Sequence, residues 1–454
     1  MQRERLGSRL GFLLLSAGCA IGLGNVWKFP YMVGQNGGGA FVLIYIFFLV
    51  ALGVPIMTME FAIGRAAQKS PVKFYQELEP KGSKWHLHGY AALAGNYLLL
   101  MFYTSVAGWL LQYFVKTVGG TFEGLDAAGI KAEYEGMLAE PGMMILSVAI
   151  TVLTAVIVCS IGLQNGLERI TKWMMLALFA IMVVLAINSI TLPGSEEGLK
   201  FYLVPDFGRM KEIGIGNVVV GAMNQAFFTL SIGIGSMAVF GSYIGKEHSL
   251  GGEALRICAL DTFVAFVAGL IIFPACSAYG VAPGTGPSLV FITLPNIFNE
   301  MPMGRLWGTM FFVFLSFAAM STIIAVFENI ISFSMDLLGW SRKKAVLVNF
   351  VAILLLSAPC ALGFNLWSGF TVLGMDISTI EDFLVSQNIL PLGSLLFVLF
   401  CVSKKGWGWD HFLAEANTGH GLMFPKGVRF YVTYILPLIV LFIFVMGYWN
   451  QFGG

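Results

Sequence analysis

The sequence predicts an integral membrane protein built from α-helices alone. Of its 454 residues, 57% are hydrophobic and only 11% are charged, and the apolar residues form long runs. A soluble domain would need a larger polar surface. A membrane β-barrel would alternate apolar and polar residues along each strand, and no such alternation occurs. We therefore expect helices that each cross the hydrocarbon layer with about 20 apolar residues.

Eleven segments are long and apolar enough to be transmembrane helices. They cover residues 10–31, 39–64, 88–119, 142–163, 167–190, 217–244, 253–280, 306–337, 343–364, 383–403 and 428–449. With the N-terminus in the cytoplasm, most of the 26 basic residues fall in inner segments, as the positive-inside rule requires. We expect the protein to lie in the cell (plasma) membrane, and an odd number of spans then places the C-terminus on its extracellular side. The first span is too long for a signal peptide and lacks a cleavage-like exit, so we expect it to be retained.

Two of these spans carry helix-breaking residues near their centres. The first holds "SAGCAIGLGNVWKFP" (Ser16–Pro30), and five spans later another holds "NQAFFTLSIGIGSMAVFGSY" (residues 224–243). Glycine alone is weak support, because small residues also let helices pack closely. Two interrupted helices at corresponding places of two five-helix halves indicate a transporter built from inverted repeats. We expect a single transmembrane domain, 1–454, with repeat one at about 10–190, repeat two at about 217–403 and an extra helix at about 428–449.

Outer segments between the spans are also expected to be ordered. The loops at about 120–141 and 191–216 are long, and the apolar stretch "GPSLVFITLPNIF" (Gly286–Phe298) reads as a short hairpin over the outer surface. Such a hairpin would act as a lid.

The chemistry of a broken helix predicts what binds there. An intact helix in lipid satisfies its own backbone groups, whereas an unwound turn leaves carbonyls and amides that are costly if bare. Freed carbonyls suit a hard cation, and the amides at a helix N-terminus suit a carboxylate. The first break therefore predicts a site for a zwitterion together with cations.

Six stretches of the chain resemble the neurotransmitter:sodium symporter family, and more closely its bacterial members. They are "GSRLGFLLLSAGCAIGLGNVWKFPY", "NGGGAFVLIYIFFLVALGVPIMTMEFAIGR", "FFTLSIGIG", "DTFVAFVAGLIIFP", "FAAMSTIIAVFE" and "IEDFLVSQNILPLG". They follow the order of the family over nearly the whole chain. The resemblance implies eleven helices in a 5+5 inverted repeat, with helices 1 and 6 broken, and sodium-coupled import of an amino acid by alternating access.

The resemblance also implies two sodium sites. The first would use the Ala20 carbonyl and the side chains of Asn25, Thr229 and Asp261, with the substrate carboxylate as a further ligand. The second would use the carbonyls of Gly18, Ile21 and Ala318 and the hydroxyls of Ser321 and Thr322. Oxygen ligands from distant parts of the chain are what a hard cation needs. Taken alone, the two hydroxyls would more simply bond back to their own helix, so only the full set indicates a site.

An amino acid is the substrate that the resemblance implies. Its carboxylate would meet the amides of Leu23 and Gly24 and the hydroxyl of Tyr103, and its amino group the carbonyls of Ala20, Phe228 and Ser231 with Thr229. Relatives that carry amines have an aspartate near the position of Gly24, and this chain has none there. The side-chain pocket would be lined by Leu99, Tyr103, Phe228, Ile234, Thr322 and Val326, which favours neutral hydrophobic amino acids.

The resemblance implies that charged residues at both ends of the path act as gates, although a charge at a helix end would by itself be unremarkable. Lys28 and Asp382 would form the outer pair, and Arg3 and Asp336 the inner one. Glu60 lies inside the second span, where a carboxylate is functional by default, although it could equally brace the backbone of a broken helix.

Three departures from the family pattern concern these elements. Leu6 stands in place of a tryptophan near the N-terminus, and Lys28 in place of an arginine. Lysine offers a point charge rather than a two-pronged donor, so a looser outer gate is expected. Leu176 occupies the position of a proline ten residues after Gly166, which puts local unwinding of the fifth helix in question.

Chloride is not expected to be required. Chloride-dependent relatives use a tyrosine and a glutamine, which have counterparts in Tyr45 and Gln225, but they carry asparagine at the place of Asp261 and serine at that of Ala265. The carboxylate of Asp261 would supply the compensating negative charge.

The sequence lacks the motifs of an enzyme or of a nucleic-acid-binding protein. An intramembrane enzyme lacks support, because there is no HExxH motif and no nucleophile–base pair, and the six cysteines lie in or beside apolar spans without CxxC pairing. No basic run with aromatics suggests nucleic acid. The expected partners are an amino acid, as a small-molecule substrate, and membrane lipid. A sodium-coupled osmolyte or amine transporter, and a channel or a non-transporting amino acid sensor on the same scaffold, stay open.

Overall fold

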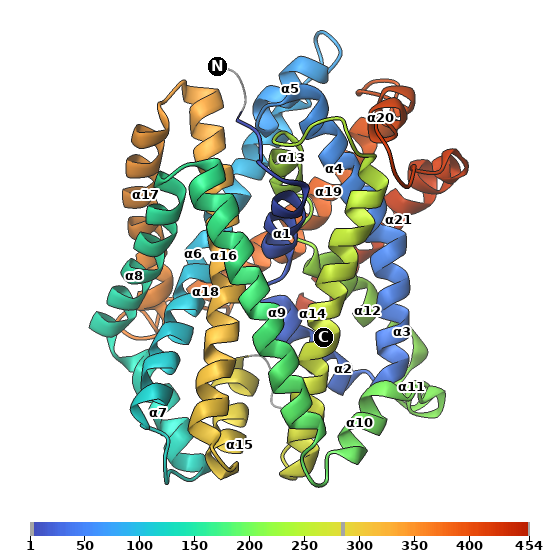
Figure 1. Ribbon diagram of the computed structural model, residues 1–454. Coiled ribbons are helices and arrows are strands. Elements are labelled where there is room, and N and C mark those ends of the chain that lie inside the picture. Colours follow the sequence, from blue (N-terminus) through green and yellow to red (C-terminus); the bar gives the residue numbers. More distant parts are fainter. Residues whose placement is uncertain (1–3, 283–286, 453–454) are drawn as a thin grey trace.

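A computed structural model describes residues 4–282 and 287–452. All regular secondary structure in this part of the chain is helical, apart from isolated β-bridges such as that between Gly38 and Pro205. The helices form one bundle (Figure 1). The predicted all-α membrane fold is confirmed.

Nine helical segments within the described residues are long and apolar enough to cross a membrane. They are Gly39–Ala67 (α3, Gly39–Phe48; η2, Leu49–Gly53; α4, Val54–Ala67), His86–Gly119 (α6), Pro141–Ser160 (α8), Leu163–Ile190 (η3, Leu163–Glu168; α9, Arg169–Ile190), Leu250–Ala278 (α14), Gly304–Leu338 (α16), Arg342–Gly363 (α17), Ile377–Val402 (α18, Ile377–Phe383; η5, Leu384–Ile389; α19, Leu390–Val402) and Lys426–Phe452 (η6, Lys426–Val428; η7, Tyr431–Ile435; α21, Leu436–Phe452).

Two of the expected spans are interrupted, at the predicted places. The first is α1 (Arg9–Ala20) followed by η1 (Gly24–Lys28) and α2 (Phe29–Gln35), which meet at a bend of 59°. The second is α12 (Ile215–Thr229) and α13 (Ser236–Gly241), which are separated by residues 230–235. Neither α12 nor α13 alone is long enough to cross a bilayer. The count of eleven spans, the division into two repeats and the extra helix stay predictions.

Shorter helices lie at the two ends of the bundle. The end that carries the N-terminus holds α5 (Pro71–Leu78), α13 and α20 (Trp409–Ala416), and the opposite end holds α7 (Ala127–Ala139), α10 (Glu196–Leu203), α11 (Phe207–Ile213) and α15 (Leu294–Glu300) (Figure 1). Helices α7, α10 and α11 lie within the two long loops that the sequence predicts to be ordered. The predicted hairpin contains η4 (Leu289–Thr293) and α15, while Gly286 lies outside the described residues.

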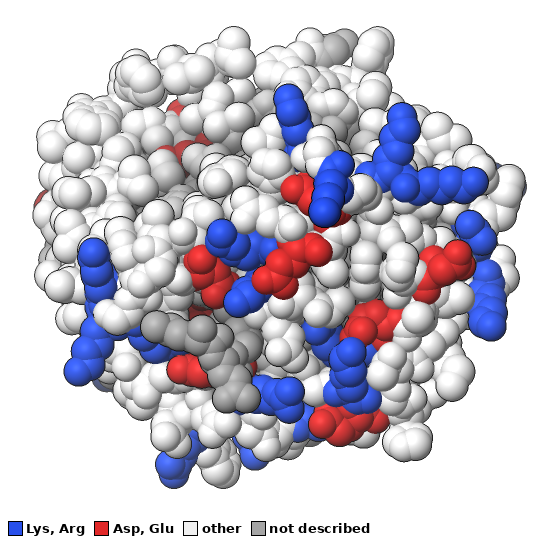
Figure 2. Space-filling model, turned by 90° about the horizontal axis from the view of Figure 1, so that it is seen from above, with Lys and Arg blue, Asp and Glu red and all other residues white. Residues whose placement is uncertain are grey.

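Helices α6 and α16 form the centre of the bundle and pack along each other. The most apolar stretch of α16 is 72% buried, whereas that of α21 is 33% buried, so α21 lies at the periphery. On the face that carries the N-terminus, basic and acidic side chains are interspersed (Figure 2). Of the two broken helices, α1 packs against α16 of this pair, whereas α12 packs mainly against α3 and α13 mainly against α4.

Candidate functional site

The two interrupted helices line one cavity of about 540 Å³. Helices α6, α16 and α18 complete its wall. Ten of the eleven predicted substrate residues line it: Ala20, Leu23, Gly24, Leu99, Tyr103, Phe228, Thr229, Ser231, Ile234 and Thr322. Val326 is fully buried on α16, one turn beyond Thr322, and is not among the lining residues.

The first break leaves the last carbonyls of α1 without helical partners, and α16 supplies donors to them. The hydroxyl of Thr322 lies 3.2 Å from the carbonyl oxygens of both Gly18 and Ile21 and 3.4 Å from that of Ala318. The hydroxyl of Ser321 donates to the Ala318 carbonyl at 2.9 Å. Water does not reach such groups in a bilayer, so they must be satisfied within the protein. The five oxygens of the predicted second sodium site are thus brought together.

Three side chains of the predicted first sodium site form a buried cluster. The Asn25 amide donates to Asp261 Oδ1 at 2.9 Å and to Thr229 Oγ1 at 3.1 Å, and Thr229 donates to Asp261 Oδ2 at 3.0 Å. All three are at most 2% exposed. The Asn25 oxygen accepts the backbone N–H of Gly22 at 3.0 Å. The cluster therefore links the first break, the end of α12 and the middle of α14.

This collection of oxygens fits a monovalent hard cation. The first cluster offers one carboxylate with a neutral amide and a neutral hydroxyl, and the second offers only carbonyls and hydroxyls. Within the described residues, no group of three or more His, Cys, Asp or Glu side chains is placed to hold a metal. Sodium accepts such all-oxygen sets, whereas softer transition metals favour imidazole and thiolate.

The second break is fixed by backbone conformation. Ser231, Gly233 and Gly235 have φ angles of 51°, 100° and 76°, in the left-handed region that favours glycine. The side chain of Glu60 accepts the backbone N–H of Gly233 at 2.6 Å. Glu60 is fully buried, and this bond gives it a bracing role for the broken helix.

Tyr103 joins the first break to α6. Its hydroxyl accepts the backbone N–H of Leu23 at 3.0 Å. Gly22 and Gly24 lie close to it along the chain, and a Cβ at Gly24 would come within 3.0 Å of the Phe228 ring. Backbone amide, hydroxyl and aromatic ring thus meet at one end of the cavity.

Part of the remaining wall is aromatic, which the sequence analysis did not foresee. Trp27, Phe102, Trp109, Tyr134 and Phe364 line the part of the cavity nearer the α7 end. Trp109 contacts Phe364 edge to face, with ring centroids 5.0 Å apart. Phe102 and Trp109, seven positions apart on one face of α6, were a signal for this wall, but such a spacing is equally typical of ordinary core packing.

The predicted outer pair is arranged differently from a simple ion pair. The Lys28 ammonium lies 3.5 Å from the centroid of the Phe228 ring, and Asp382 accepts a hydrogen bond from Ser386 at 2.6 Å. Both Lys28 and Asp382 line the cavity, yet no ion pair within 4.0 Å joins them in the described part of the chain. A lysine suits this arrangement because an ammonium can sit over an aromatic face.

At the other end, Arg3 lies outside the described residues. Asp336 accepts the backbone N–H of Ser70 at 2.7 Å. Leu6 stands where the family pattern has a tryptophan, and its backbone N–H donates a hydrogen bond of 3.1 Å to the Tyr243 carbonyl. Leu176 lies within an unbroken α9.

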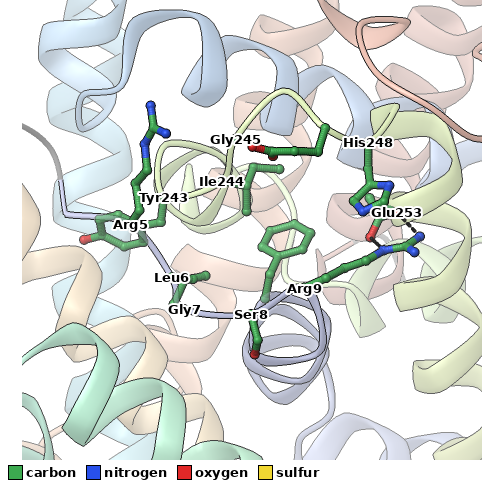
Figure 3. A pocket seen from close by; sticks show the side chains of 12 residues that line it. Arg5, Leu6, Gly7, Ser8, Arg9, Tyr243, Ile244, Gly245, His248 and Glu253 are labelled. Atoms are coloured by element: carbon green, nitrogen blue, oxygen red, sulfur yellow. Dashed lines mark hydrogen bonds and ion pairs between the residues drawn. The ribbon is translucent and has the colours of Figure 1, made fainter.

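A second pocket of about 300 Å³ lies beside this N-terminal segment (Figure 3). Arg9 and Glu253 form an ion pair of 2.6 Å at its edge (Figure 3), and Arg256 contacts the same carboxylate at 2.6 Å. Glu328 is buried and pairs with Arg342 at 2.5 Å. Sequence analysis missed all three ion pairs, because a charged residue alone gives no sign of which partner it takes.

Comparisons with known proteins agree with this geometry. A model of the sodium:neurotransmitter symporter family matches residues 3–123 and 130–451. The "Uncharacterized sodium-dependent transporter YhdH" of Bacillus subtilis is 36% identical over 440 residues, covering 96% of each chain. An "Uncharacterized sodium-dependent transporter" of Haemophilus influenzae is 33% identical over 458 residues, covering 98% of each.

A solved structure shows the same fold. The crystal structure of MhsT in complex with L-phenylalanine superposes with a TM-score of 0.87 at 37% identity, and the match covers 98% of this chain and 100% of that one. These matches extend over nearly the whole chain and include relatives above 30% identity. The protein therefore belongs to the sodium:neurotransmitter symporter family.

Proposed function

We propose that the protein imports neutral, hydrophobic amino acids together with sodium, by alternating access. Its family consists of sodium-dependent transporters rather than enzymes. The observation that carries the proposal is the meeting of both broken helices at one cavity, where polar backbone and the Asn25–Thr229–Asp261 cluster adjoin apolar walls. Polar groups at one end and apolar groups at the other suit an amino acid with a hydrophobic side chain.

The substrate carboxylate is assigned to the amides of Leu23 and Gly24 and the hydroxyl of Tyr103. The Leu23 amide already lies 3.0 Å from the Tyr103 oxygen, so one carboxylate can reach both groups. The amino group is assigned to carbonyls near the breaks, with help from a hydroxyl: Ala20, Phe228 and Ser231 for the carbonyls and Thr229 for the hydroxyl.

Two sodium ions are proposed to bind with the substrate. The first would be held by Ala20, Asn25, Thr229, Asp261 and the substrate carboxylate, and the second by Gly18, Ile21, Ala318, Ser321 and Thr322. The hydrogen bonds within each set support this assignment, since a cation entering there would replace donors that now occupy the same oxygens. Chloride is proposed not to be required.

The side-chain pocket favours branched and aromatic amino acids. Leu99 and Ile234 line it together with the aromatic wall, and glycine would leave this apolar surface unfilled. The structure of MhsT contains bound L-phenylalanine, which supports the proposal that this protein also accepts an aromatic amino acid.

We assign the N-terminal face to the cytoplasm and the C-terminus to the outside of the plasma membrane. Lys28 and Asp382 would then close the outer side of the site, and Arg3 and Asp336 the inner side.

Uptake into sodium-free proteoliposomes, placed in buffer with or without sodium, tests the proposal. An inward sodium gradient should drive concentrative uptake of radiolabelled leucine and phenylalanine, and Asp261→Ala should abolish it, whereas Asp410→Ala, at an exposed position on α20, should not. Preference for a betaine-like osmolyte or an amine in a competition panel would reject the amino acid assignment. Sodium-dependent binding without any uptake would identify a sensor instead.

A further inference from the structure

Two buried asparagines form a hydrogen-bonded pair beside the cavity. The Asn329 amide donates to the Asn96 side-chain oxygen at 3.1 Å and to the Ser236 hydroxyl at 2.6 Å. The Asn96 amide donates to the Ile234 carbonyl at 3.0 Å and to the Ala92 carbonyl at 2.8 Å. Both asparagines are fully buried. The pair therefore ties the second break to α6 and to α16 at once.

The spacing of these residues places the pair directly against the substrate pocket. On α6, Asn96 precedes Leu99 and Tyr103 by three and seven positions, and both of those line the cavity. Residues three, four and seven apart share one face of a helix. The pair thus continues the pocket face of α6 toward the N-terminal end of the bundle.

The same holds on α16. Asn329 follows Thr322, a lining residue, by seven positions, so it too lies one to two turns nearer the N-terminal end. The pocket-facing sides of α6 and α16 are joined by the hydrogen bond between Asn96 and Asn329. The part of the second break that contains Ile234 is bonded to this pair.

The second break needs such donors, because its backbone is not helical. Residues 230–235 lie outside α12 and α13, so the Ile234 carbonyl has no place in a helical ladder. A buried carbonyl without a donor is costly. Asn96 uses both amide hydrogens and Asn329 uses both of its own, so each contact requires one side-chain orientation. The four hydrogen bonds donated by the two asparagines therefore hold the second break in one arrangement.

We propose that Asn96 and Asn329 act as positioning residues for substrate selection, by fixing Ile234 and so the length of side chain that the pocket accepts. This inference rests on the proposed amino acid transport. Neither asparagine lines the cavity, so they act through Ile234 and Ser236. With the pair intact, Ile234 holds its place against a long side chain. With the pair broken, the segment yields to a large substrate and packs less closely on a small one.

Binding measurements on the purified full-length chain test this inference. Asn96→Ala and Asn329→Ala should each raise the affinity for tryptophan relative to leucine by roughly three- to tenfold, the range expected for one net hydrogen bond. The double variant should change the ratio no more than the stronger single variant, because both act through one segment. The sodium concentration at half-saturation should stay within about twofold, since the pair contacts none of the oxygens assigned to sodium.

Asn349 provides a matched control. It is also buried, donates to a serine hydroxyl (Ser334, 2.9 Å) and to a carbonyl of its own helix (Ala345, 2.8 Å), and accepts a hydrogen bond from Tyr97. Asn349→Ala should lower stability without changing the tryptophan-to-leucine ratio. A merely structural role for Asn96 and Asn329 would give the same result as this control.

The outcomes separate the inference from the function on which it rests. An unchanged ratio, or a ratio shifted toward leucine, in Asn96→Ala or Asn329→Ala samples that still bind amino acid overturns the inference alone. If these variants do not fold, Ser236→Ala removes one acceptor with a smaller change and should shift the ratio in the same direction; no shift there overturns the inference too. Absence of sodium-dependent amino acid binding by the unmodified protein would instead reject the proposed function.

Discussion

The two broken helices use glycine for different purposes. In the first break, Gly18, Gly22 and Gly24 have ordinary φ angles, and a Cβ on each would meet side chains of other helices. In the second, Gly233 and Gly235 have left-handed φ angles, and a Cβ on Gly233 would meet the backbone carbonyl of Leu390. Side chains can move aside, whereas backbone cannot. The first break is therefore an adaptable surface, and the second is a fixed frame.

The neighbours of the two breaks differ in part. The first break is contacted by the side-chain amides of Asn25 and Gln225. It is also contacted by the hydroxyls of Thr322 and Tyr103, which can exchange partners when a ligand arrives. A carboxylate and an amide, from Glu60 and Asn96, hold the second break by its backbone. A transporter with one adaptable and one fixed half can bind ions without losing the shape of its pocket.

The largest effect should come from breaking the fixed frame. Gly233→Ala forces a left-handed φ of 100° on a residue with a Cβ and pushes that atom into the Leu390 carbonyl, at a strain of about 1–3 kcal/mol before the clash is counted. We expect loss of sodium-dependent substrate binding and a lower yield of monodisperse protein.

Gly24→Ala is the matched change in the adaptable break. Its Cβ would lie 3.0 Å from the edge of the Phe228 ring, which can turn. We expect folded protein with substrate affinity reduced by roughly threefold to tenfold, about one kcal/mol. Equal damage by the two substitutions, measured by size-exclusion profile and by binding, would remove the distinction between the breaks.

An effect of similar size, on sodium rather than on substrate affinity, is expected from the hydroxyls that serve the adaptable break. Replacing both Ser321 and Thr322 by alanine leaves only carbonyls at the proposed second sodium site. The sodium concentration needed for half-maximal substrate binding should rise by roughly tenfold, because two neutral ligands are lost.

The control for this change is Ser316→Ala. Ser316 lies on the same helix, and its hydroxyl has no hydrogen-bond partner among the described residues. Its sodium profile should match that of the unmodified protein. An unchanged profile in the double variant would place the second sodium elsewhere.

Sequence reasoning located the breaks and most residues of the candidate site, and the reason lies in their chemistry. Several glycines with polar residues at the centre of an apolar span are unusual for a transmembrane helix, so a break can be predicted there from the sequence alone. The resemblance then assigned Asn25, Thr229 and Asp261 to one cluster, and the structure brings them within hydrogen-bonding distance. The bend of 59° between α1 and α2 follows from the same signal.

Contacts between distant, ordinary residues could not be predicted in this way. Asn96 and Asn329 are neutral amides within long helical spans, and nothing local pairs them across 233 positions. The resemblance assigned Lys28 to Asp382, but the Lys28 ammonium lies over the Phe228 ring, because the geometry of the first break decides where it points. Val326 was placed in the pocket wall by position alone, and the turn of α16 leaves it behind Thr322.

A modest effect is expected where the two breaks touch through Lys28. Its ammonium lies on the Phe228 ring at the end of α12, and such a contact contributes about 0.5–2 kcal/mol. Lys28→Met keeps most of the length and removes the charge. Bound substrate should leave from the outer side a few-fold faster, which chase experiments with labelled amino acid measure.

Lys28→Arg is the companion variant, because it retains both the charge and the stacking on the ring. Its release rate should stay near that of the unmodified protein. If Lys28→Arg released substrate as fast as Lys28→Met, the cation over the ring would not hold the gate.

The smallest effect, none at all, is expected from removing chloride. Asp261 bonds to Asn25 of the first break and to Thr229 at the edge of the second, so its charge serves both. A carboxylate about 4 Å from sodium, at an effective dielectric near 20, contributes on the order of 4 kcal/mol, which is comparable to a bound anion.

Transport in sodium gluconate and in sodium chloride should therefore proceed at the same rate. The double variant Asp261→Asn with Ala265→Ser removes that carboxylate while two buried groups remain nearby, Tyr45 and Gln225, each with an oxygen that lacks a hydrogen-bond partner in the described chain. This variant should transport in chloride and lose activity in gluconate, because an external anion, held by a donor such as the Tyr45 hydroxyl rather than by the Gln225 oxygen, must then replace the missing charge. Stimulation of the unmodified protein by chloride would show that Asp261 does not supply the compensating charge. A variant equally inactive in both salts would show that the carboxylate is needed for more than its charge. The hydrogen bonds of Asp261 to Asn25 and to Thr229, which connect the adaptable break to the fixed one, would then be essential.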